Sequence, residues 1–78
     1  MIPAVCRAAR ALIGWSQSDL AAAAEVAPAT VKNYESGRRE PLTKNLTDMR
    51  RALEAGGVRF IDGDEPGVQL VKRKGKRS

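Results

Sequence analysis

The first helix of this chain is predicted by apolar residues that recur every three to four positions. Over residues 4–13 this spacing places one row of apolar side chains on the inner side of a helix. Gly14 ends the helix, because glycine readily adopts the left-handed conformation found after many helices. The inward row consists of Val5, Ala8 or Ala9, and Leu12.

Two shorter helices joined by a tight turn are predicted next. Ser16 suits the N-cap of the first, since its hydroxyl accepts a hydrogen bond from a free backbone N–H. Asp19 places a carboxylate near the positive end of that helix's dipole. Residues 25–27 have about the length of a turn. Pro28 suits the first position of the second helix, where a missing N–H costs nothing.

The helix that begins at Pro28 has an inner and an outer side. Val31 and Tyr34 are three residues apart and are expected to face inward. Gly37 ends the helix, and Pro41 blocks an early continuation. Such a helix, with small residues at its start, can lie close to a DNA groove. The outer side consists of Pro28, Ala29, Lys32 and Asn33.

A fourth helix and a β-hairpin are predicted in the last third of the chain. β-type residues occur at 58–62 and again at 68–71, and residues 63–67 carry the glycine, aspartate and proline of a turn. An isolated hairpin is only marginally stable in water, so this one needs a surface to pack against. The helix covers residues 43–55, with an apolar face of Leu46, Met49 and Leu53.

The composition fits one small domain without a disulfide or a metal site. The 78 residues include a single cysteine, Cys6, and no histidine, which excludes an internal disulfide and the usual zinc sites. No apolar run approaches membrane-spanning length, so no membrane contact is expected. A glycine-rich phosphate loop and a nucleophile beside a base are both missing, so we expect neither an enzyme nor a cofactor.

The net charge of +5 is concentrated at the C-terminus. Residues 1–47 carry a surplus of two positive charges and residues 48–65 a surplus of two negative charges, whereas the last seven residues contain five basic groups and no acidic one. We expect this tail, residues 72–78, to be disordered. It either adds a salt-sensitive attraction to DNA phosphates or only keeps the chain soluble.

An ordered set of residues resembles the helix-turn-helix proteins of Cro and phage-repressor type, also called the lambda-repressor-like or xenobiotic-response-element family. The set consists of Arg7, Arg10, Ser16, Gln17, Leu20, Ala21, Val26, Thr30, Val31, Glu35, Gly37, Pro41, Leu46 and Leu53. The resemblance implies a mainly α, lambda-repressor-like bundle of four or possibly five helices, followed here by a C-terminal β-hairpin or strand pair. It also implies that the third helix binds the major groove of double-stranded DNA.

The resemblance also implies roles for residues on the first three helices. Arg10 and Glu35 match a partly buried ion pair that links the first helix to the third, although two solvated charges remain an alternative. Gln17 matches a residue that contacts the DNA backbone, assisted by the N–H groups at the start of its helix. An ordinary polar residue at the helix start is the alternative for Gln17.

The residues expected to read bases depart from the better-known members of this family. Ala27 stands where a Ser or Thr cap is usual, and Ala29 stands where phage repressors often carry glutamine. Neither alanine side chain can form a hydrogen bond, but both can contact a thymine methyl. Pro28 lies with Ala29 on the side expected to read bases. Lys32 and Asn33 are the expected polar readers, since lysine suits guanine and asparagine suits adenine. The alternative is that Lys32 only contacts a phosphate, while DNA shape supplies part of the specificity.

Other polar residues are expected to contact the DNA backbone. Thr30 lies at the edge of the recognition helix, Arg38 and Arg39 follow it in a loop, and Lys44 is near the start of the next helix. Arg39 has the alternative of pairing with Glu40 or Asp48 on its own chain.

The domain organisation expected from these patterns has three parts. Residues 1–57 form the helix-turn-helix domain, residues 58–71 a hairpin for dimerisation, and residues 72–78 the basic tail. The hairpin either exchanges or pairs strand edges with a second copy, or folds back on its own helices. The apolar residues assigned to the dimer interface are Val58, Phe60, Ile61 and Leu70.

The predicted function is that of a sequence-specific transcription regulator located in the cytoplasm, at the nucleoid. Its partners are double-stranded DNA and a second copy of itself, and it binds a palindromic operator. A chain of this length leaves no room for an effector domain, which favours a repressor over an activator. The alternative is a protein-interaction module with the same fold, such as an anti-activator or an antitoxin-like subunit.

Overall fold

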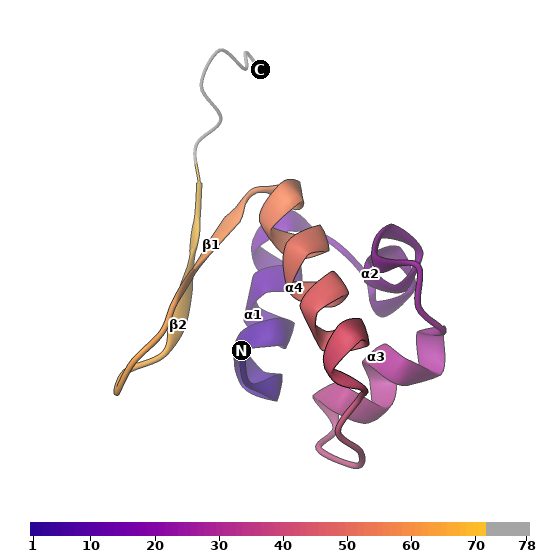
Figure 1. The fold of residues 1–78 in the computed structure, drawn as a ribbon. Coiled ribbons are helices and arrows are strands. Elements are labelled where there is room, and N and C mark those ends of the chain that lie inside the picture. The colour runs from indigo at the N-terminus through magenta and orange to yellow at the C-terminus, as the bar shows by residue number, and fades with distance from the viewer. Residues whose placement is uncertain (72–78) are drawn as a thin grey trace.

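The computed structural model describes residues 1–71, which form four helices followed by a two-stranded antiparallel sheet (Figure 1). This arrangement confirms the predicted fold class. The predicted helices over residues 4–13 and 43–55 are each one residue longer in the structure, and the tail at 72–78 lies outside the described residues. The elements are α1 (Pro3–Ile13), α2 (Gln17–Ala24), α3 (Pro28–Glu35), α4 (Thr43–Gly56), β1 (Val58–Ile61) and β2 (Gly67–Leu70).

The inner side of α1 differs from the predicted row at its C-terminal end. Val5 and Ala9 are buried as expected, but Leu12 is 41% exposed. Ile13 packs against the core instead, because it lies four residues beyond Ala9 and therefore on the same side of the helix. Cys6, which was not assigned to the inward row, is fully buried beside Val5.

α2 begins with a capping box and ends with a residue in the left-handed conformation. The Ser16 hydroxyl accepts a hydrogen bond from the Asp19 N–H at 3.0 Å, and the Asp19 carboxylate accepts one from the Ser16 N–H at 2.9 Å. Glu25 ends α2 in the left-handed conformation, with a φ of 60°. Val26 then packs against the core, so the turn between α2 and α3 is anchored.

The core lies between the helices, where residues from all four meet. Its fully buried large side chains are Leu20 of α2, Val31 of α3, and Met49 and Leu53 of α4. At the end of α4, a Cβ atom on Gly56 would lie 2.8 Å from the Ile13 side chain and 2.9 Å from the Trp15 ring. The absence of a side chain at that position therefore allows α4 to end directly against the end of α1.

The hairpin folds back on the helices of its own chain. β1 and β2 pair with Val58 opposite Leu70 and Phe60 opposite Val68, and β1 lies against α4 while β2 lies against α1. Arg50 of α4 stacks over the Phe60 ring, with 4.9 Å between the guanidinium carbon and the ring centroid. Its guanidinium also donates to Asp62 at 3.1 Å, so α4 holds both the strand and the start of the turn.

This packing contradicts the prediction for two of the four residues assigned to the dimer interface. Val58 and Phe60 are 3% and 8% exposed because their side chains complete the chain's own core. Neither side chain is therefore available at the surface for a partner. Ile61 and Leu70 remain at the surface, with 41% and 59% of their area exposed.

One buried carboxylate joins α1, α2 and α3. The Arg10 guanidinium donates to Glu35 through Nε and Nη2, each at 2.7 Å from a carboxylate oxygen. The Gln17 amide donates to the same carboxylate at 3.0 Å, and the Cys6 thiol donates to it at 3.2 Å. Arg7 donates to the Glu35 backbone carbonyl. These five donors come from two other helices and fix the position of the last turn of α3.

Hydrogen bonds and the charge of Arg10 keep the buried Glu35 carboxylate ionised. Burial alone would raise the pKa of Glu35, but the hydrogen bonds from Arg10, Gln17 and Cys6 and the charge of Arg10 outweigh it. The pKa of Glu35 therefore lies below its ordinary value of 4.5. Burial and the nearby Glu35 carboxylate raise the pKa of the Cys6 thiol to about 12, so the thiol stays protonated and serves as a donor.

The substitution Glu35→Gln should lower the free energy of unfolding by about 3–5 kcal/mol, because it leaves the Arg10 charge without its partner in a largely buried site. Urea unfolding at neutral pH measures the loss. Asp48→Asn is the matched control, since it removes the carboxylate of an exposed ion pair with Lys44 and should cost far less. Equal losses in the two variants would contradict the role of the network.

Acid should destabilise the domain through Glu35. Its native pKa is lower than the ordinary 4.5, so the unfolded state binds more protons and stability rises with pH in this range. The contribution is present above pH 4.5 and is lost as the pH falls from there through the native pKa, by up to about 1.4 kcal/mol per pH unit. A carbon-13 NMR titration of the Glu35 carboxyl group checks this, and a midpoint above 4.5 would refute it.

Candidate nucleic-acid interface

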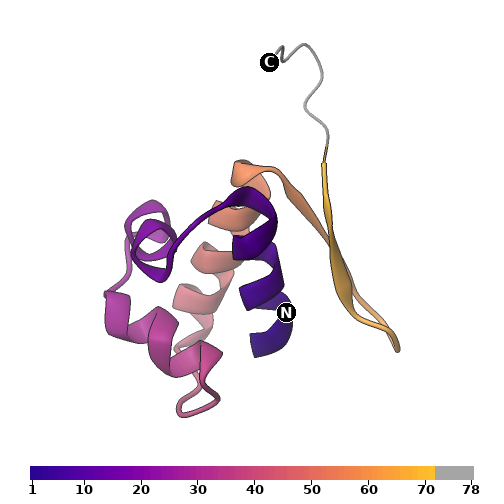
Figure 2. The same ribbon diagram turned by 180° about the vertical axis from the view of Figure 1, so that it is seen from behind.

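The outer side of α3 is not covered by the rest of the chain. Pro28, Ala29 and Lys32 are exposed, and Asn33 is half-buried, whereas Val31 on the other side is fully buried. Figures 1 and 2 place α3 at one end of the molecule and the hairpin at the other. Most of the outer side of the helix is therefore open to a partner.

The polar side chains on this side have no partner within the part of the chain that the structure describes. No hydrogen bond or ion pair joins the side chain of Thr30, Lys32 or Asn33 to another residue in 1–71. Glu35, one turn further on, has all its acceptor capacity taken up by the network described above. The Tyr34 hydroxyl, also on the inner side, donates to the Met1 carbonyl at 2.6 Å. Within residues 1–71, α3 thus has two hydrogen-bonded polar side chains facing inward and three without a partner on the side predicted to contact DNA.

The start of α3 carries no side-chain cap. Ala27 occupies the N-cap position, and its methyl group cannot accept the N–H groups of the first turn. Pro28 and Ala29 follow with short apolar side chains, and the backbone N–H of Ala29 has no hydrogen-bond partner among residues 1–71. This end can approach a groove floor closely, with only apolar side-chain contacts available.

A shallow pocket lies beside α3, where the loop after it meets the start of α4. Its lining includes Thr30, Asn33 and Arg39, three of the residues that the sequence analysis assigns to DNA contacts. It also adds Leu42 and Asn45, which the sequence analysis missed. The signal for Asn45 was its place in the first turn of the predicted helix 43–55, whereas nothing marked Leu42, which is 74% exposed.

The two loop arginines are exposed, and their backbone is held by the carbonyl of Asn33. The backbone N–H groups of Arg38 and Arg39 both donate to the Asn33 carbonyl, at 2.9 and 3.3 Å. Their guanidinium groups have no partner among residues 1–71, and Arg39 pairs with neither Glu40 nor Asp48 there. Both cations are therefore available for phosphate groups.

Lys44 and Gln17 differ from this pattern because each has a partner in its own chain. The Lys44 ammonium group lies 2.8 Å from Asp48, which raises the pKa of Lys44 and partly balances its charge. The Gln17 amide donates to Glu35, so one of its two N–H groups is already used. The second N–H of the Gln17 amide, at the start of α2, is the donor that can contact a phosphate.

The structure offers no site for a metal ion within residues 1–71, since no three His, Cys, Asp or Glu side chains gather there in a way that could hold one. No helix in the same part of the chain has the length and apolar character needed to cross a membrane.

Comparison with known proteins identifies the family. No curated protein gives a significant match to the chain. The family model for helix-turn-helix proteins of Cro and repressor type matches residues 7–56, which include all of α2, α3 and α4 and most of α1. This match covers more than half of the chain and the same helices that carry the open side of α3. The chain therefore belongs to the helix-turn-helix family of DNA-binding transcription regulators.

Proposed function

We propose that this protein is a sequence-specific repressor that binds a palindromic operator as a homodimer. The observation that supports this most strongly is the open outer side of α3, whose polar side chains have no partner in residues 1–71. In this proposal α3 lies in the major groove, and a copy of α3 from a second chain reads the other half-site. Occupying a promoter in this way excludes RNA polymerase and represses transcription.

Two kinds of contact would read the operator. Lys32 and Asn33 supply hydrogen-bond donors and, for Asn33, an acceptor, which suit the edges of guanine and adenine. Pro28 and Ala29 supply only apolar contact, which suits the methyl group of thymine. The operator half-site would therefore combine a purine read by hydrogen bonds with a thymine read by its methyl group.

Contacts to phosphates would set the position of α3 in the groove. Arg38 and Arg39 are the strongest candidates, because both are exposed and without an ion-pair partner in the described structure. Thr30 and the free part of the Gln17 amide would contact the backbone on either side of the recognition helix. Lys44 would contribute less, since Asp48 already pairs with it.

The double substitution Lys32→Ala with Asn33→Ala should abolish preference for the operator, because each lost base contact costs about 1–3 kcal/mol. The operator is first selected from random DNA with the native protein, and binding is then measured by fluorescence anisotropy. Arg51→Ala is the control, since it removes an exposed cation from α4 and should leave the preference unchanged. An unchanged footprint for the double variant would refute the assignment of α3 as the base-reading helix.

Replacing thymine by uracil in the selected operator should weaken binding about fourfold at each position that faces Pro28 or Ala29, because one methyl contact is worth about 0.8 kcal/mol. The same replacement in the flanking DNA should have no effect. If no thymine in the half-site is sensitive to loss of its methyl group, the apolar start of α3 does not read bases.

A further inference from the structure

We propose that a second copy of this chain pairs with the free edge of β2, so that two hairpins form one four-stranded antiparallel sheet about a two-fold axis at Gln69. This inference gives the proposed homodimer a defined interface, and it rests on that proposal. The partner is the chain itself, and the contact lies on residues that the helix-turn-helix match over 7–56 does not include.

The backbone of β2 has groups available for such pairing. The Val71 N–H donates to the Gly57 carbonyl at 2.7 Å, so the backbone groups of Val71 point toward β1. Backbone groups of an antiparallel strand alternate in direction, so those of Gln69 also point toward β1. Those of Val68 and Leu70 point away from it. Within residues 1–71 these outward groups have no partner, and they form an open strand edge.

A two-fold axis at Gln69 satisfies all of these outward groups. It places Val68 of one copy opposite Leu70 of the other, and each such pair exchanges two hydrogen bonds. Pro66, the next residue on the same edge, has no N–H, so the ladder ends there without an unpaired donor. An axis at Val68 would instead place Leu70 opposite Pro66 and lose one hydrogen bond on each side.

Apolar side chains are exposed on this side of the molecule. Leu70 and Val71 are 59% and 39% exposed, and Leu12 is exposed on α1, the helix against which β2 lies. In the proposed sheet Leu70 packs next to Val68 of the second copy, on the same face as Phe60. Part of this exposed apolar area is then removed from water.

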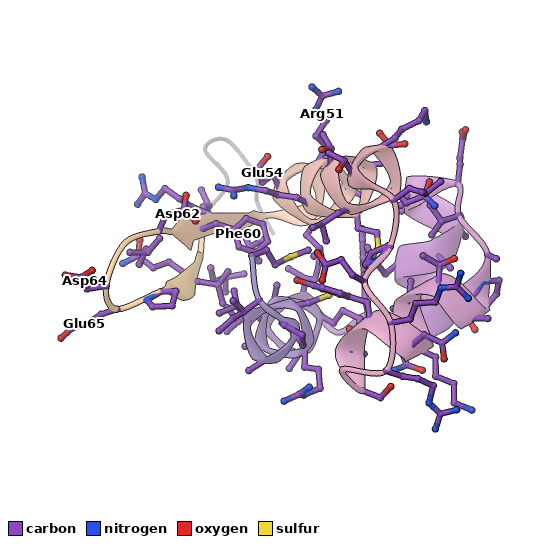
Figure 3. All side chains as sticks on the ribbon, turned by 60° about the horizontal axis from the view of Figure 1, so that its bottom comes forward. Arg51, Glu54, Phe60, Asp62, Asp64 and Glu65 are labelled. Carbon is purple, nitrogen blue, oxygen red and sulfur yellow. The ribbon has the colours of Figure 1, made fainter. Side chains whose placement is uncertain are left out.

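The other edge of the hairpin is less suited to pairing because charged groups lie beside it. Arg50 of α4 stacks on Phe60 of β1 and forms an ion pair with Asp62 at the start of the turn. It also forms an ion pair with Glu54 on its own helix. Figure 3 shows Glu54 and Asp62 on the side of the hairpin that faces α4. Charged side chains along a strand edge discourage further strand addition.

A disulfide test reports the position of the axis directly. Gln69 lies opposite its own copy in a pair without hydrogen bonds, where Cα atoms are about 4.5 Å apart and cysteines can be bridged. We expect Gln69→Cys to form a covalent dimer with oxidised glutathione, without DNA, while Cys6 stays reduced because it is fully buried. Arg59→Cys, exposed on the same face but on β1, is the control and should stay monomeric. Equal cross-linking of the two variants, or none at Gln69→Cys, overturns the proposal.

A second test measures the strength of association by sedimentation, again without DNA. Leu70→Lys should raise the dissociation constant of the dimer about tenfold or more, because it places a charge in the apolar part of the contact. Ile61→Lys introduces the same charge on β1, at a side chain that is also on the surface although less exposed than Leu70, and should change the dissociation constant less than about twofold. Circular dichroism confirms that both variants fold. A native chain that is monomeric at about 100 μM, or equal effects of the two substitutions, overturns the proposal.

Operator binding is measured separately from association, so the two proposals can fail independently. A chain that dimerises through β2 and does not prefer any DNA sequence contradicts the proposed function and supports this interface. A chain that prefers an operator but cross-links equally at Gln69→Cys and Arg59→Cys supports the function and overturns the interface.

Discussion

The orientation of α3 depends on a single buried carboxylate. Glu35 receives hydrogen bonds from Arg10, Gln17 and Cys6, which lie on two different helices, and Arg10 also donates to the Trp15 carbonyl at 2.9 Å. A buried charge is tolerated only when it is paired and hydrogen-bonded, so the three helices can meet in few other ways. The short α3, of eight residues, could not hold a fixed direction from its own backbone bonds alone.

Saturating this carboxylate also separates the two sides of α3. The inward-facing Glu35 carboxylate takes its partners from the protein, whereas the side chains of Lys32 and Asn33 on the outer side have none within residues 1–71. A recognition surface needs both conditions at once. The inner contacts hold the helix still, and the outer side chains keep their hydrogen-bonding capacity for the groove.

The parts of the fold that follow from neighbours in sequence were predictable. The Ser16 cap, the helix start at Pro28 and the open side of α3 all depend on residues within four positions of one another. The packing of the hairpin was not predictable in this way, because alternation shows that Phe60 has a buried side but not whether its own chain or a partner buries it. Likewise, the contacts of Cys6 and Gln17 with the same carboxylate required three helices to be placed in space first.

The shared carbonyl of Asn33 has a consequence for how this surface reads DNA. The amides of Arg38 and Arg39 both bind the backbone carbonyl of Asn33, so the start of the loop is held against the end of α3 by main-chain hydrogen bonds. In the proposed complex, these bonds would fix where the loop backbone lies relative to the bases that Asn33 reads. Changing the length of this loop would then be expected to alter the spacing between the phosphate contacts and the base contacts.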